Sequence, residues 1–409
     1  MNKVLVIGGG AAGMMAAVFA ARAGAETVLL EPNERLGKKL NITGKGRCNV
    51  TNDSACDELI AHVPRNGKFL YSAFSRWDGR DTMAFFESLG VPLKVERGKR
   101  VYPASDRSFD ISAALERELK RLDVRLIRDR AEALTLMDGR VSGVKGGRER
   151  YGADAVVVAT GGVSYPATGS SGDGYRFAKQ VGHTVVAPRA SLVPLESNDP
   201  DCAAMQGLSL RNVTLTVRNQ KNKTVFEELG ELLFTHFGVS GPLVLSASAH
   251  MRDFERDSYR LIIDLKPALD EKKLDERLLR DFAARSNQDF GNVLGGLVPR
   301  SMIPVIVRRT GIPAAAKANS ITKEQRRRLL ETLKAFSVSV TGPRGVEEAI
   351  VTSGGVRVGE IDPNTMASKH IAGLYFAGEV IDVDAYTGGF NLQIAWATGR
   401  AAGEAAAGL

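Results

Sequence analysis

Cysteine, histidine and aromatic residues are scarce in this chain of 409 residues, and each scarcity excludes a class of protein. Its three cysteines, Cys48, Cys56 and Cys202, are too few and too scattered for a disulfide framework or a Cys-x-x-Cys metal site. The five histidines show no metal-ligand spacing, so no metal is expected. Free cysteines suit a reducing compartment, and we therefore expect a cytoplasmic protein.

Long apolar runs are also missing. No segment offers about 20 strongly apolar residues in a row, so no membrane-spanning helix is expected. The first 21 residues carry a single charge, at Lys3, but they include three consecutive glycines, which argues against a secretory signal peptide. With 44% hydrophobic and 25% charged residues, the chain has the composition of an ordinary soluble protein of two or three domains.

Positive charge is in moderate excess, with a net charge of +8 and a pI near 9.3. A basic protein suits anionic ligands such as dinucleotides, and it also suits nucleic acid. The cations are dispersed apart from residues 326–328, and 6% aromatic residues provide no evident base-stacking platform. We therefore expect a small-molecule substrate in preference to nucleic acid and no membrane partner, and we leave the oligomeric state open.

The most informative segment that is present is GGGAAG at residues 8–13. It follows the apolar run 4–7 and precedes a helix-like stretch at residues 14–23. Strand, tight turn and helix in this order are typical of a dinucleotide-binding fold, whereas the glycine pattern alone would be weak evidence.

Three glycines of this turn each have a physical reason. Gly8 permits the tight turn, Gly10 lets the backbone approach a pyrophosphate, and Gly13 lets the helix pack close to the strand. Ala11 and Ala12 lead into the predicted helix, whose N-terminus offers unpaired N–H groups and the positive end of a dipole to the phosphates. These five residues are therefore predicted cofactor contacts.

A second strand at residues 27–31 ends in a carboxylate, Glu31. A Glu at this place can accept hydrogen bonds from both ribose hydroxyls of an adenosine, and it would repel a 2′-phosphate. The sequence therefore disfavours NADP at this site. The competing interpretation is a glycine-rich packing turn with a surface Glu.

The remaining pattern predicts a mixed α/β protein whose chain returns to its first domain. Residues 57–89 have helical spacing, and an Asp138-Gly139 pair predicts a hairpin turn. Buried strands are expected at residues 155–159 and 373–378. Since doubly wound sheets place ligands at the carboxyl ends of their strands, these strands and the first two would converge on one extended ligand.

Six segments, in order along nearly the whole chain, carry a resemblance to a known family: VIGGGAAGMMAA at 6–17, GKKLNITGKGRCNVTN at 37–52, ATGG at 159–162, ELLFTHFGVSGP at 231–242, TSGGV at 352–356 and GLYFAGEVIDVDAYTGGFNLQIAWATG at 373–399. The chain resembles the HI0933-like, or aminoacetone-oxidase-like, family of FAD-binding flavoproteins. The resemblance implies non-covalently bound FAD and an enzyme that is an FAD-dependent oxidoreductase.

The resemblance also implies a discontinuous Rossmann domain of the glutathione-reductase type, interrupted by a β-barrel domain and a small helical domain. Short β-like runs follow residue 189, and helical patterns fill residues 267–336, so the sequence pattern agrees. We predict an FAD-binding domain at 1–188 and 353–409, a β-rich barrel domain at 189–266 and 337–352, and a helical insert at 267–336.

Further FAD contacts follow from the matched segments. The donor-rich loop at residues 37–52 can run along a diphosphate and ribityl chain, and the Gly378-Glu379 pair resembles the motif that holds a ribityl hydroxyl. The predicted contacts beyond the first turn and Glu31 are Lys39, Gly46, Arg47, Cys48, Asn49, Ala131, Ala159, Thr160, Gly161, Gly378, Glu379, Gly389, Phe390, Asn391 and Leu392. Among these, Ala131 rests on analogy with related flavoproteins, and Cys48 is expected to be a wall beside the cofactor rather than a redox-active thiol.

The substrate side is less informative. Candidates for acid–base work at the flavin are His236, Tyr165, Tyr386 and Arg100, although a lone His in an apolar run is more often structural. Hydride chemistry at a flavin needs no covalent protein nucleophile, so the lack of a Ser-His-Asp pattern carries little weight.

The predicted function is hydride transfer through flavin N5 on an unidentified small organic substrate, with NAD(P)H as donor or O2 as acceptor. Three alternatives stay open. They are an NAD dehydrogenase with one cofactor, an RNA-binding or RNA-modifying flavoprotein, and a flavin-binding protein without turnover. The loop at residues 37–52 and the Gly378-Glu379 pair argue against the first, because a shorter ligand would leave both unused.

Overall fold

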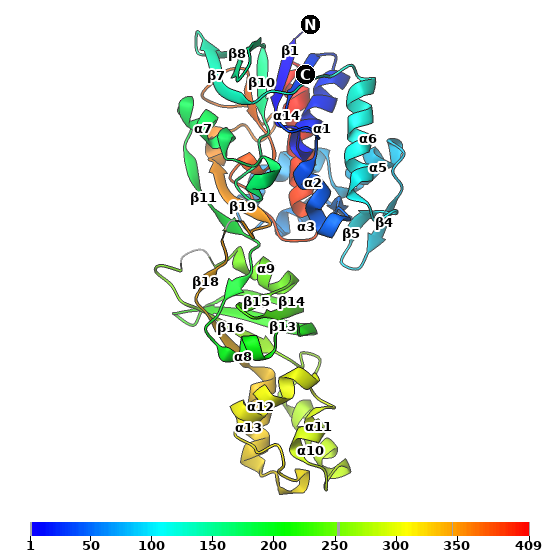
Figure 1. Cartoon of the computed structure of the whole chain (residues 1–409), viewed down its shortest axis with the longest axis vertical. Coiled ribbons are helices and arrows are strands. Elements are labelled where there is room, and N and C mark those ends of the chain that lie inside the picture. The colour runs from blue at the N-terminus through cyan, green and yellow to red at the C-terminus, as the bar shows by residue number, and fades with distance from the viewer. Residues whose placement is uncertain (1, 252–253, 346, 409) are drawn as a thin grey trace. The chain divides into compact units, whose positions relative to one another are not determined.

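The computed structural model describes residues 2–251, 254–345 and 347–408 (Figure 1). The chain divides into two compact units, one of Met1–Ser191 with Gly345–Leu409 and one of Leu192–Arg344. The end residues of the predicted FAD-binding domain, 1 and 409, lie outside the described residues.

The first unit is built on a five-stranded sheet in the order β20-β10-β1-β2-β6, in which every neighbouring pair is parallel. Its strands are β1 (Lys3–Ile7), β2 (Glu26–Leu30), β6 (Arg125–Ile127), β10 (Ala155–Val158) and β20 (Leu374–Phe376). The central strands β1 and β10 are almost entirely Val, Leu, Ile and Ala and are buried, as a parallel sheet covered on both faces requires. The predicted return of the chain to its first sheet is confirmed.

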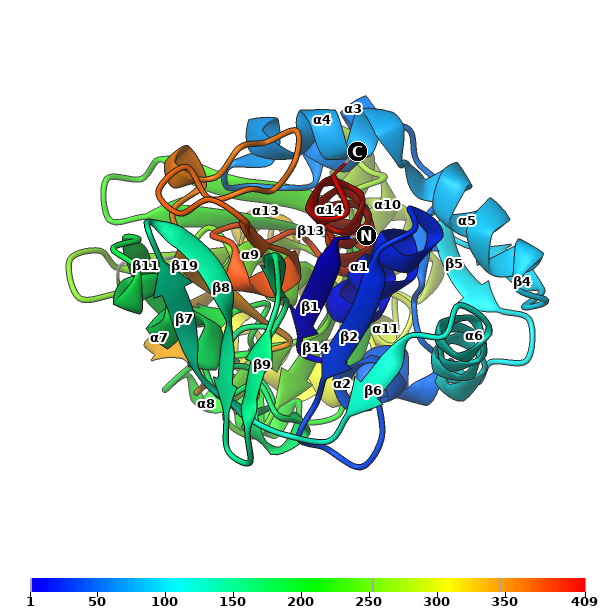
Figure 2. The ribbon, with the colours of Figure 1, turned by 90° about the horizontal axis from the view of Figure 1, so that it is seen from above.

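Helices α1 (Ala11–Arg22) and α14 (Phe390–Ala406) pack side by side although they lie at opposite ends of the chain (Figure 2). Glycine makes the close approach possible. A Cβ at Gly399 would lie 2.5 Å from the Ala12 carbonyl oxygen, and a Cβ at Gly403 would lie 2.2 Å from that of Ala16. This contact joins the last helix of the chain to the first turn.

The helical stretch expected at residues 57–89 is interrupted, so that prediction was wrong in detail. The structure has α3 (Cys56–Ala61), the 3-10 turn η2 (Gly67–Leu70), α4 (Tyr71–Arg76) and α5 (Gly79–Ser88). Asn66 adopts a left-handed φ of 57°, and Asp78 starts α5 through a capping box with Asp81. Apolar periodicity does not register such local capping, which divides one periodic stretch into separate helices.

A three-stranded meander packs against β10. It comprises β7 (Ala131–Met137), β8 (Arg140–Gly146) and β9 (Arg150–Gly152). The hairpin turn at Asp138 and Gly139 has φ values of 51° and 74°, as a type I′ turn requires, and the prediction of this turn is confirmed.

Shorter elements complete this unit. They are α2 (Lys38–Ile42), η1 (Thr43–Gly46), β3 (Thr51–Asn52), β4 (Leu93–Glu96), β5 (Arg100–Pro103), α6 (Ser108–Arg121), η3 (Pro166–Thr168), α7 (Asp173–Gln180), β11 (Val185–Ser191), β19 (Val351–Val356), η6 (Val358–Glu360) and η7 (Gly378–Val380). Strands β3, β5 and β4 form one small sheet, and β11 pairs with β19 in another.

The second unit contains a seven-stranded sheet in the order β17-β16-β13-β14-β15-β12-β18, with antiparallel pairs throughout. Its strands are β12 (Leu195–Glu196), β13 (Ser209–Asn219), β14 (Thr224–Thr235), β15 (Gly238–Ser240), β16 (Tyr259–Asp264), β17 (Phe336–Val340) and β18 (Gly342–Pro343). Its helices are α8 (Pro200–Ala204), α9 (Pro242–Ser248), α10 (Glu271–Ala284), α11 (Phe290–Leu294), α12 (Ile303–Thr310) and α13 (Lys323–Lys334), with 3-10 turns η4 (Arg300–Met302) and η5 (Ala318–Ser320). Division of this unit into a barrel and a helical insert stays a prediction.

Candidate functional site

The carboxyl edge of the parallel sheet has a switch point between β1 and β10. From β1 the chain builds outward to β2 and β6 on one side, and then to β10 and β20 on the other. The two loops that leave the switch point touch, since a Cβ at Gly8 would lie 2.5 Å from the Ala159 carbonyl oxygen. Open α/β sheets bind their ligands at such a point.

The turn after β1 is open on the side where a phosphate would lie. No described atom lies within 4 Å of a Cβ built at Gly10, whereas a Cβ at Gly13 would lie only 1.8 Å from the Gly8 carbonyl oxygen. No side chain caps α1 at Gly10. The first N–H groups of α1, including those of Ala11 and Ala12, therefore remain available to an anion.

Glu31 follows β2 and is held in place by three hydrogen bonds. Gly9 N donates to Oε2 at 2.7 Å, and Asn33 donates to Oε1 from its backbone N at 2.8 Å and from Nδ2 at 2.7 Å. Each carboxylate oxygen accepts two hydrogen bonds, so Oε2 retains capacity for a ribose hydroxyl. Asn33 is a positioning residue that the sequence interpretation missed.

The loop after β10 contributes an orphaned polar group. The Thr160 hydroxyl is inaccessible to solvent and has no hydrogen-bond partner among the described residues. Next to it, Gly161 adopts a φ of 71°, and a Cβ at Gly162 would lie 2.3 Å from Thr352 Oγ1. Because these two glycines have no side chains, the loop can approach Ser170 and Thr352 closely.

Lys39 and Glu379 form an ion pair across 340 positions of sequence, with Lys39 Nζ 2.6 Å from Glu379 Oε2. Burial alone would raise the pKa of Glu379, but the Lys39 ammonium and hydrogen bonds from Thr352 N (2.7 Å) and Ser164 Oγ (3.0 Å) lower it below its usual value. Glu379 is therefore ionised. Because the Lys39 ammonium also donates to Ser164 Oγ, its role at a phosphate stays a prediction.

Arg47 is occupied within its own loop. Its Nη2 lies 2.5 Å from Glu96 and 2.6 Å from Asp106, and the guanidinium lies 4.1 Å from the centre of the Tyr102 ring. The two carboxylates raise the pKa of Arg47 above its usual value. The side chain thus fastens the loop at residues 43–49, and the backbone of Gly46 and Arg47 is what the loop can offer to a cofactor.

Cys48 lies in the same loop, fully buried and with a left-handed φ of 57°. Burial raises the pKa of its thiol to about 12, against a smaller opposing effect of the Thr43 side chain. The thiol is therefore protonated near neutral pH, which agrees with a wall rather than a redox-active group.

The start of α14 is assembled from three segments. Asn49 fits its surroundings with Oδ1 accepting from Gly389 N at 3.0 Å and Nδ2 donating to the Thr51 and Val101 carbonyls. Asn391 Nδ2 donates to the Ala385 carbonyl at 2.8 Å. Gly389 has a φ of 98°, and no side chain caps the helix.

The first N–H groups of α14 are consequently open, and the positive end of its dipole can stabilise negative charge nearby. Phe390 and Leu392 lie in this first turn, and Phe390 stacks on His62 with ring centroids 4.3 Å apart. On the β20 side, a Cβ at Gly378 would lie 2.7 Å from the Ala12 Cβ, so Gly378 adjoins the start of α1.

The remaining predicted residues lie in several places. Ala131 is the buried first residue of β7. Arg100 is the first residue of β5 and donates from Nε to the Arg97 carbonyl at 3.0 Å. Tyr165 precedes η3 with a φ of 52°, and the Tyr386 ring meets His62 edge-on.

His236 belongs to the second unit and is exposed in the turn between β14 and β15, edge-on to Phe237. The four acid–base candidates are thus divided between the units, three in the first and one in the second. Their roles stay predictions.

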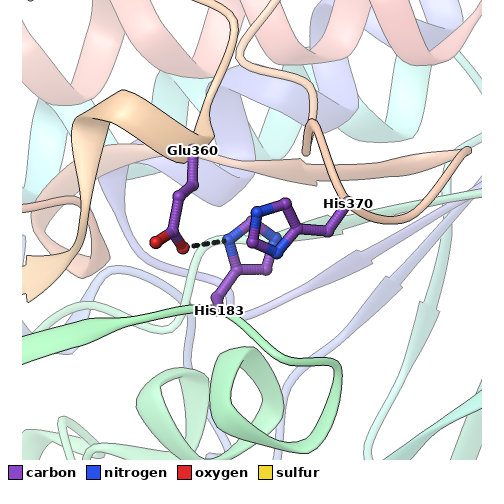
Figure 3. Close-up of side chains that lie close together, drawn as sticks. All are labelled: His183, Glu360 and His370. Carbon is purple, nitrogen blue, oxygen red and sulfur yellow. Dashed lines mark hydrogen bonds and ion pairs between the residues drawn. The ribbon is translucent and has the colours of Figure 1, made fainter.

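One group in the described residues approaches a metal-ligand arrangement that sequence spacing did not reveal. Potential ligand atoms of His183, Glu360 and His370 lie within 4.8 Å of one another (Figure 3). The two imidazole rings stack, with centroids 4.4 Å apart and planes only 11° apart. The nitrogen lone pairs of an imidazole lie in the plane of its ring. In two stacked, nearly parallel rings these lone pairs do not converge on one point, which does not favour one shared ion.

Hydrogen bonding gives His183 a different role. Ser368 Oγ accepts from the backbone N of His370 at 3.1 Å and of Ile371 at 2.9 Å, which fills its lone pairs. Its own proton therefore goes to His183 Nε2 at 2.7 Å, and His183 Nδ1 carries the ring proton toward Glu360 at 3.1 Å. Burial lowers the pKa of His183, which favours the neutral ring, and its single free lone pair, on Nε2, already accepts the Ser368 hydrogen bond.

The open turn at Gly10 and the free acceptor on Glu31 together fit a dinucleotide that lies across the switch point. The uncapped start of α14 offers a further anion-stabilising group. The fold and this edge define a dinucleotide-binding protein of the Rossmann type.

Comparison with known proteins identifies the family. The HI0933-like protein Rossmann domain matches residues 2–405, and the chain belongs to the HI0933-like family. A 3-dehydro-bile acid delta(4,6)-reductase of Clostridium scindens is 33% identical, covering 100% of this chain and 99% of the relative. A ribosomal RNA dihydrouridine synthase of Escherichia coli is 32% identical, covering 96% and 95%.

A solved structure, the 3-ketosteroid-delta4-(5alpha)-dehydrogenase of Rhodococcus jostii, superposes with a TM-score of 0.53 at 16% identity, covering 100% of this chain and 97% of that chain. This likeness shows the fold. The predicted fold class and the predicted family are confirmed, and the protein is an FAD-dependent oxidoreductase. No helix within the described ranges is long and apolar enough to cross a membrane.

Proposed function

We propose that this enzyme reduces a carbon–carbon double bond that is conjugated to a carbonyl group. One observation carries the proposal: relatives that match nearly the whole chain at similar identity have names that share this chemistry. The bile-acid reductase acts on unsaturated bonds of a 3-oxo compound, and the dihydrouridine synthase saturates a uracil ring, whose double bond adjoins a carbonyl.

The site residues suit the cofactor that this reaction needs. FAD, when bound, supplies and accepts the hydride. The turn at Gly10 and the first turn of α1 would hold its phosphates, and Glu31 would hold the adenosine ribose. Glu379, kept ionised by Lys39, would accept a ribityl hydroxyl. The uncapped start of α14 would stabilise negative charge on the ring system, which favours the reduced state.

The reaction adds a hydride to the carbon remote from the carbonyl and a proton to the carbon beside it. The proton donor we propose is one of the acid–base candidates Arg100, Tyr165, Tyr386 and His236. The other predicted FAD contacts of the loops after β1 and β10 and of the loop at residues 43–49 would hold the cofactor through backbone groups.

Anaerobic stopped-flow spectroscopy tests the proposal. The holoenzyme is reduced with dithionite and mixed with a 3-oxo-delta4 steroid or with uridine-containing ribosomal RNA. Reoxidation of the flavin by at least one of them is expected, together with a product that has gained two hydrogen atoms. The saturated steroid ketone is the matched control and should leave the flavin reduced. In a separate mixing experiment the reduced enzyme meets O2. Reoxidation by O2, with no reoxidation by either unsaturated compound, would overturn the proposal.

We further propose a reduced nicotinamide as electron donor. The same instrument compares NADH and NADPH as reductants of the oxidised holoenzyme without substrate. Bleaching of the flavin absorbance by either nucleotide supports this part of the proposal. If neither nucleotide bleaches the flavin, a reduced nicotinamide is not the electron donor.

A further inference from the structure

Positive charge is concentrated in one part of the second unit. Residues 267–336, which include α10 to α13, contain 14 Lys and Arg against 8 Asp and Glu, a net charge of +6. The whole chain carries only +8. The other 339 residues are therefore close to neutral, and the basic character of the protein belongs mainly to this helical segment, which is coloured yellow in Figure 1.

Many of these cations have no partner. Six exposed side chains of the segment form no ion pair with any described residue, namely Lys272, Arg280, Arg285, Arg300, Lys323 and Arg328. Three exposed carboxylates of the segment are likewise unpaired, Glu271, Glu276 and Glu324. The surplus therefore lies on the surface, where it is available to an external anion.

Part of this surplus borders a groove between α10 and α13. Lys272 lines the groove from α10, and Lys323 and Arg327 line it from α13. Arg327 also pairs with Glu331 at 3.6 Å, whereas Lys323 and Lys272 have no carboxylate partner among the described residues. Arg326 is tied down by Asp275 at 2.7 Å and contributes less. Glu271, Asp275 and Glu324 also line the groove, so its own excess is one positive charge, and the unpaired cations outside it supply the rest.

The scarcity of exposed apolar side chains in the segment limits the kinds of partner that it could bind. Leu279 is its only exposed large hydrophobic side chain, and Phe282, Phe290 and Phe336 are buried. Amphipathic helices that lie in a membrane surface and the cores of stable protein interfaces both bury apolar side chains, which this segment does not expose apart from Leu279. A partner that is recognised by repeated phosphates needs none.

We propose that the helical segment at residues 267–336 is a docking surface for RNA, held through its phosphates. This inference rests on one part of the proposed function, namely that the unsaturated substrate is a uracil base in RNA. Without exposed aromatic side chains the surface reads no bases by stacking, so its binding is independent of sequence and steeply dependent on salt.

Fluorescence anisotropy with the holoenzyme and a ribosomal RNA fragment, over a salt series, tests the proposal. The triple variant Lys272→Glu/Lys323→Glu/Arg328→Glu removes unpaired cations only. We expect it to lose at least about tenfold in affinity, and its slope of log K against log salt should become shallower by about two. The matched control, Lys68→Glu/Lys120→Glu/Lys179→Glu, changes three exposed lysines of the first unit by the same net charge and should bind like the unmodified enzyme.

Equal binding by the triple variant and the unmodified enzyme would overturn the proposal, as would equal losses in triple variant and control. Vesicles of phosphatidylserine serve as competitor, and displacement of RNA by them at comparable phosphate concentration would overturn the choice of RNA. Flavin absorbance and steroid reduction are recorded for every variant. Binding is measured without turnover, so the two proposals can fail separately. If RNA binding depends on the three cations but no dihydrouridine forms, the docking surface is supported and RNA as the reduced substrate is contradicted.

Discussion

The turn at residues 8–13 and the loop at residues 43–49 both contain glycine and both are predicted cofactor contacts, yet the turn has only backbone donors whereas the loop also has side-chain donors. In the turn, Gly10 faces open space and the first N–H groups of α1 are uncapped. In the loop, the Arg47 guanidinium binds Glu96 and Asp106, and the Asn49 amide holds the start of α14. The segment without polar side chains thus leaves its backbone donors open, whereas the segment with polar side chains uses them to hold its own neighbours.

The largest effect that separates the two regions should come from the turn. Replacing Gly13 by Ala places a Cβ 1.8 Å from the Gly8 carbonyl oxygen, so the packing of α1 on β1 must shift. Overpacking of this kind costs about 1–3 kcal/mol, and we expect loss of bound FAD as well. Thermal unfolding and the flavin content of the purified variant measure both effects.

Gly10→Ala sharpens this test because its new Cβ meets no protein atom within 4 Å. The apoprotein should unfold at an unchanged temperature, while FAD affinity falls at least about tenfold because the methyl group intrudes on the phosphates. Gly152→Ala, also in open space but in β9, is the matched control and should change neither quantity. If Gly10→Ala binds FAD as tightly as the unmodified enzyme does, the FAD phosphates do not lie beside Gly10.

The next effect concerns the ion pair that links the start of the loop to the end of the sheet. Glu379→Gln leaves the Lys39 ammonium without its carboxylate in a site where both side chains are about one-fifth exposed. Because solvent screens a pair that is partly exposed, we expect a loss of about 1 kcal/mol in unfolding free energy, together with weaker FAD binding. Lys39→Met and the double variant complete a cycle, and additive losses would show that the two residues do not interact.

The same pair predicts a pH dependence. Because the pKa of Glu379 is lowered in the folded protein, the stability it contributes is present above the ordinary Glu value of 4.5 and is lost as the pH falls through the lowered value. Urea unfolding between pH 3 and pH 7 measures this loss, which should be smaller in Glu379→Gln. An identical pH profile in both proteins would contradict the assigned ionisation.

A smaller effect is expected in the loop. Arg47→Met removes contacts to Glu96 and Asp106 that lie near the surface, so the affinity for FAD should fall by only about two- to fivefold. Raising the ionic strength should weaken FAD binding by the unmodified enzyme more than binding by the variant. A loss as large as that of Gly10→Ala would mean that the guanidinium contacts the cofactor itself.

The smallest effect is predicted for Cys48. Since burial raises the pKa of its thiol to about 12, the native protein should not react with Ellman's reagent at this position near pH 8. Partly exposed Cys56 should react first. Cys48→Ala should retain the rate of flavin reduction, and a large fall in that rate would restore a redox role for the thiol.

Much of the fold followed from local pattern. The buried strands, the glycine turn after β1, the carboxylate at the end of β2 and the Asp138-Gly139 hairpin are each visible within about a dozen residues, because strand period and turn chemistry are local properties. The interrupted helices at residues 57–89 were not visible, since the left-handed Asn66 and the capping box at Asp78 break a periodic stretch without changing its apolar spacing.

The candidate site was predicted in part for the same reason. Glu31 was recognised by its place after a strand, whereas Asn33, Ser164 and Thr352 were missed, because their roles are to hold other side chains rather than a ligand. Thr352 lies in a segment that the family resemblance matched, and its neighbouring glycines were the only available signal.

The sequence by itself determined where the backbone must be free of side chains, because a glycine requirement arises from the conformation and contacts of a single position. It also determined the family and thereby the cofactor. Tertiary structure decided which charges meet. Lys39 and Glu379 are 340 positions apart, and His183 stacks on His370 without any spacing that announces it. A charge acquires its role from its neighbours in space, and those neighbours are set only when distant segments pack together.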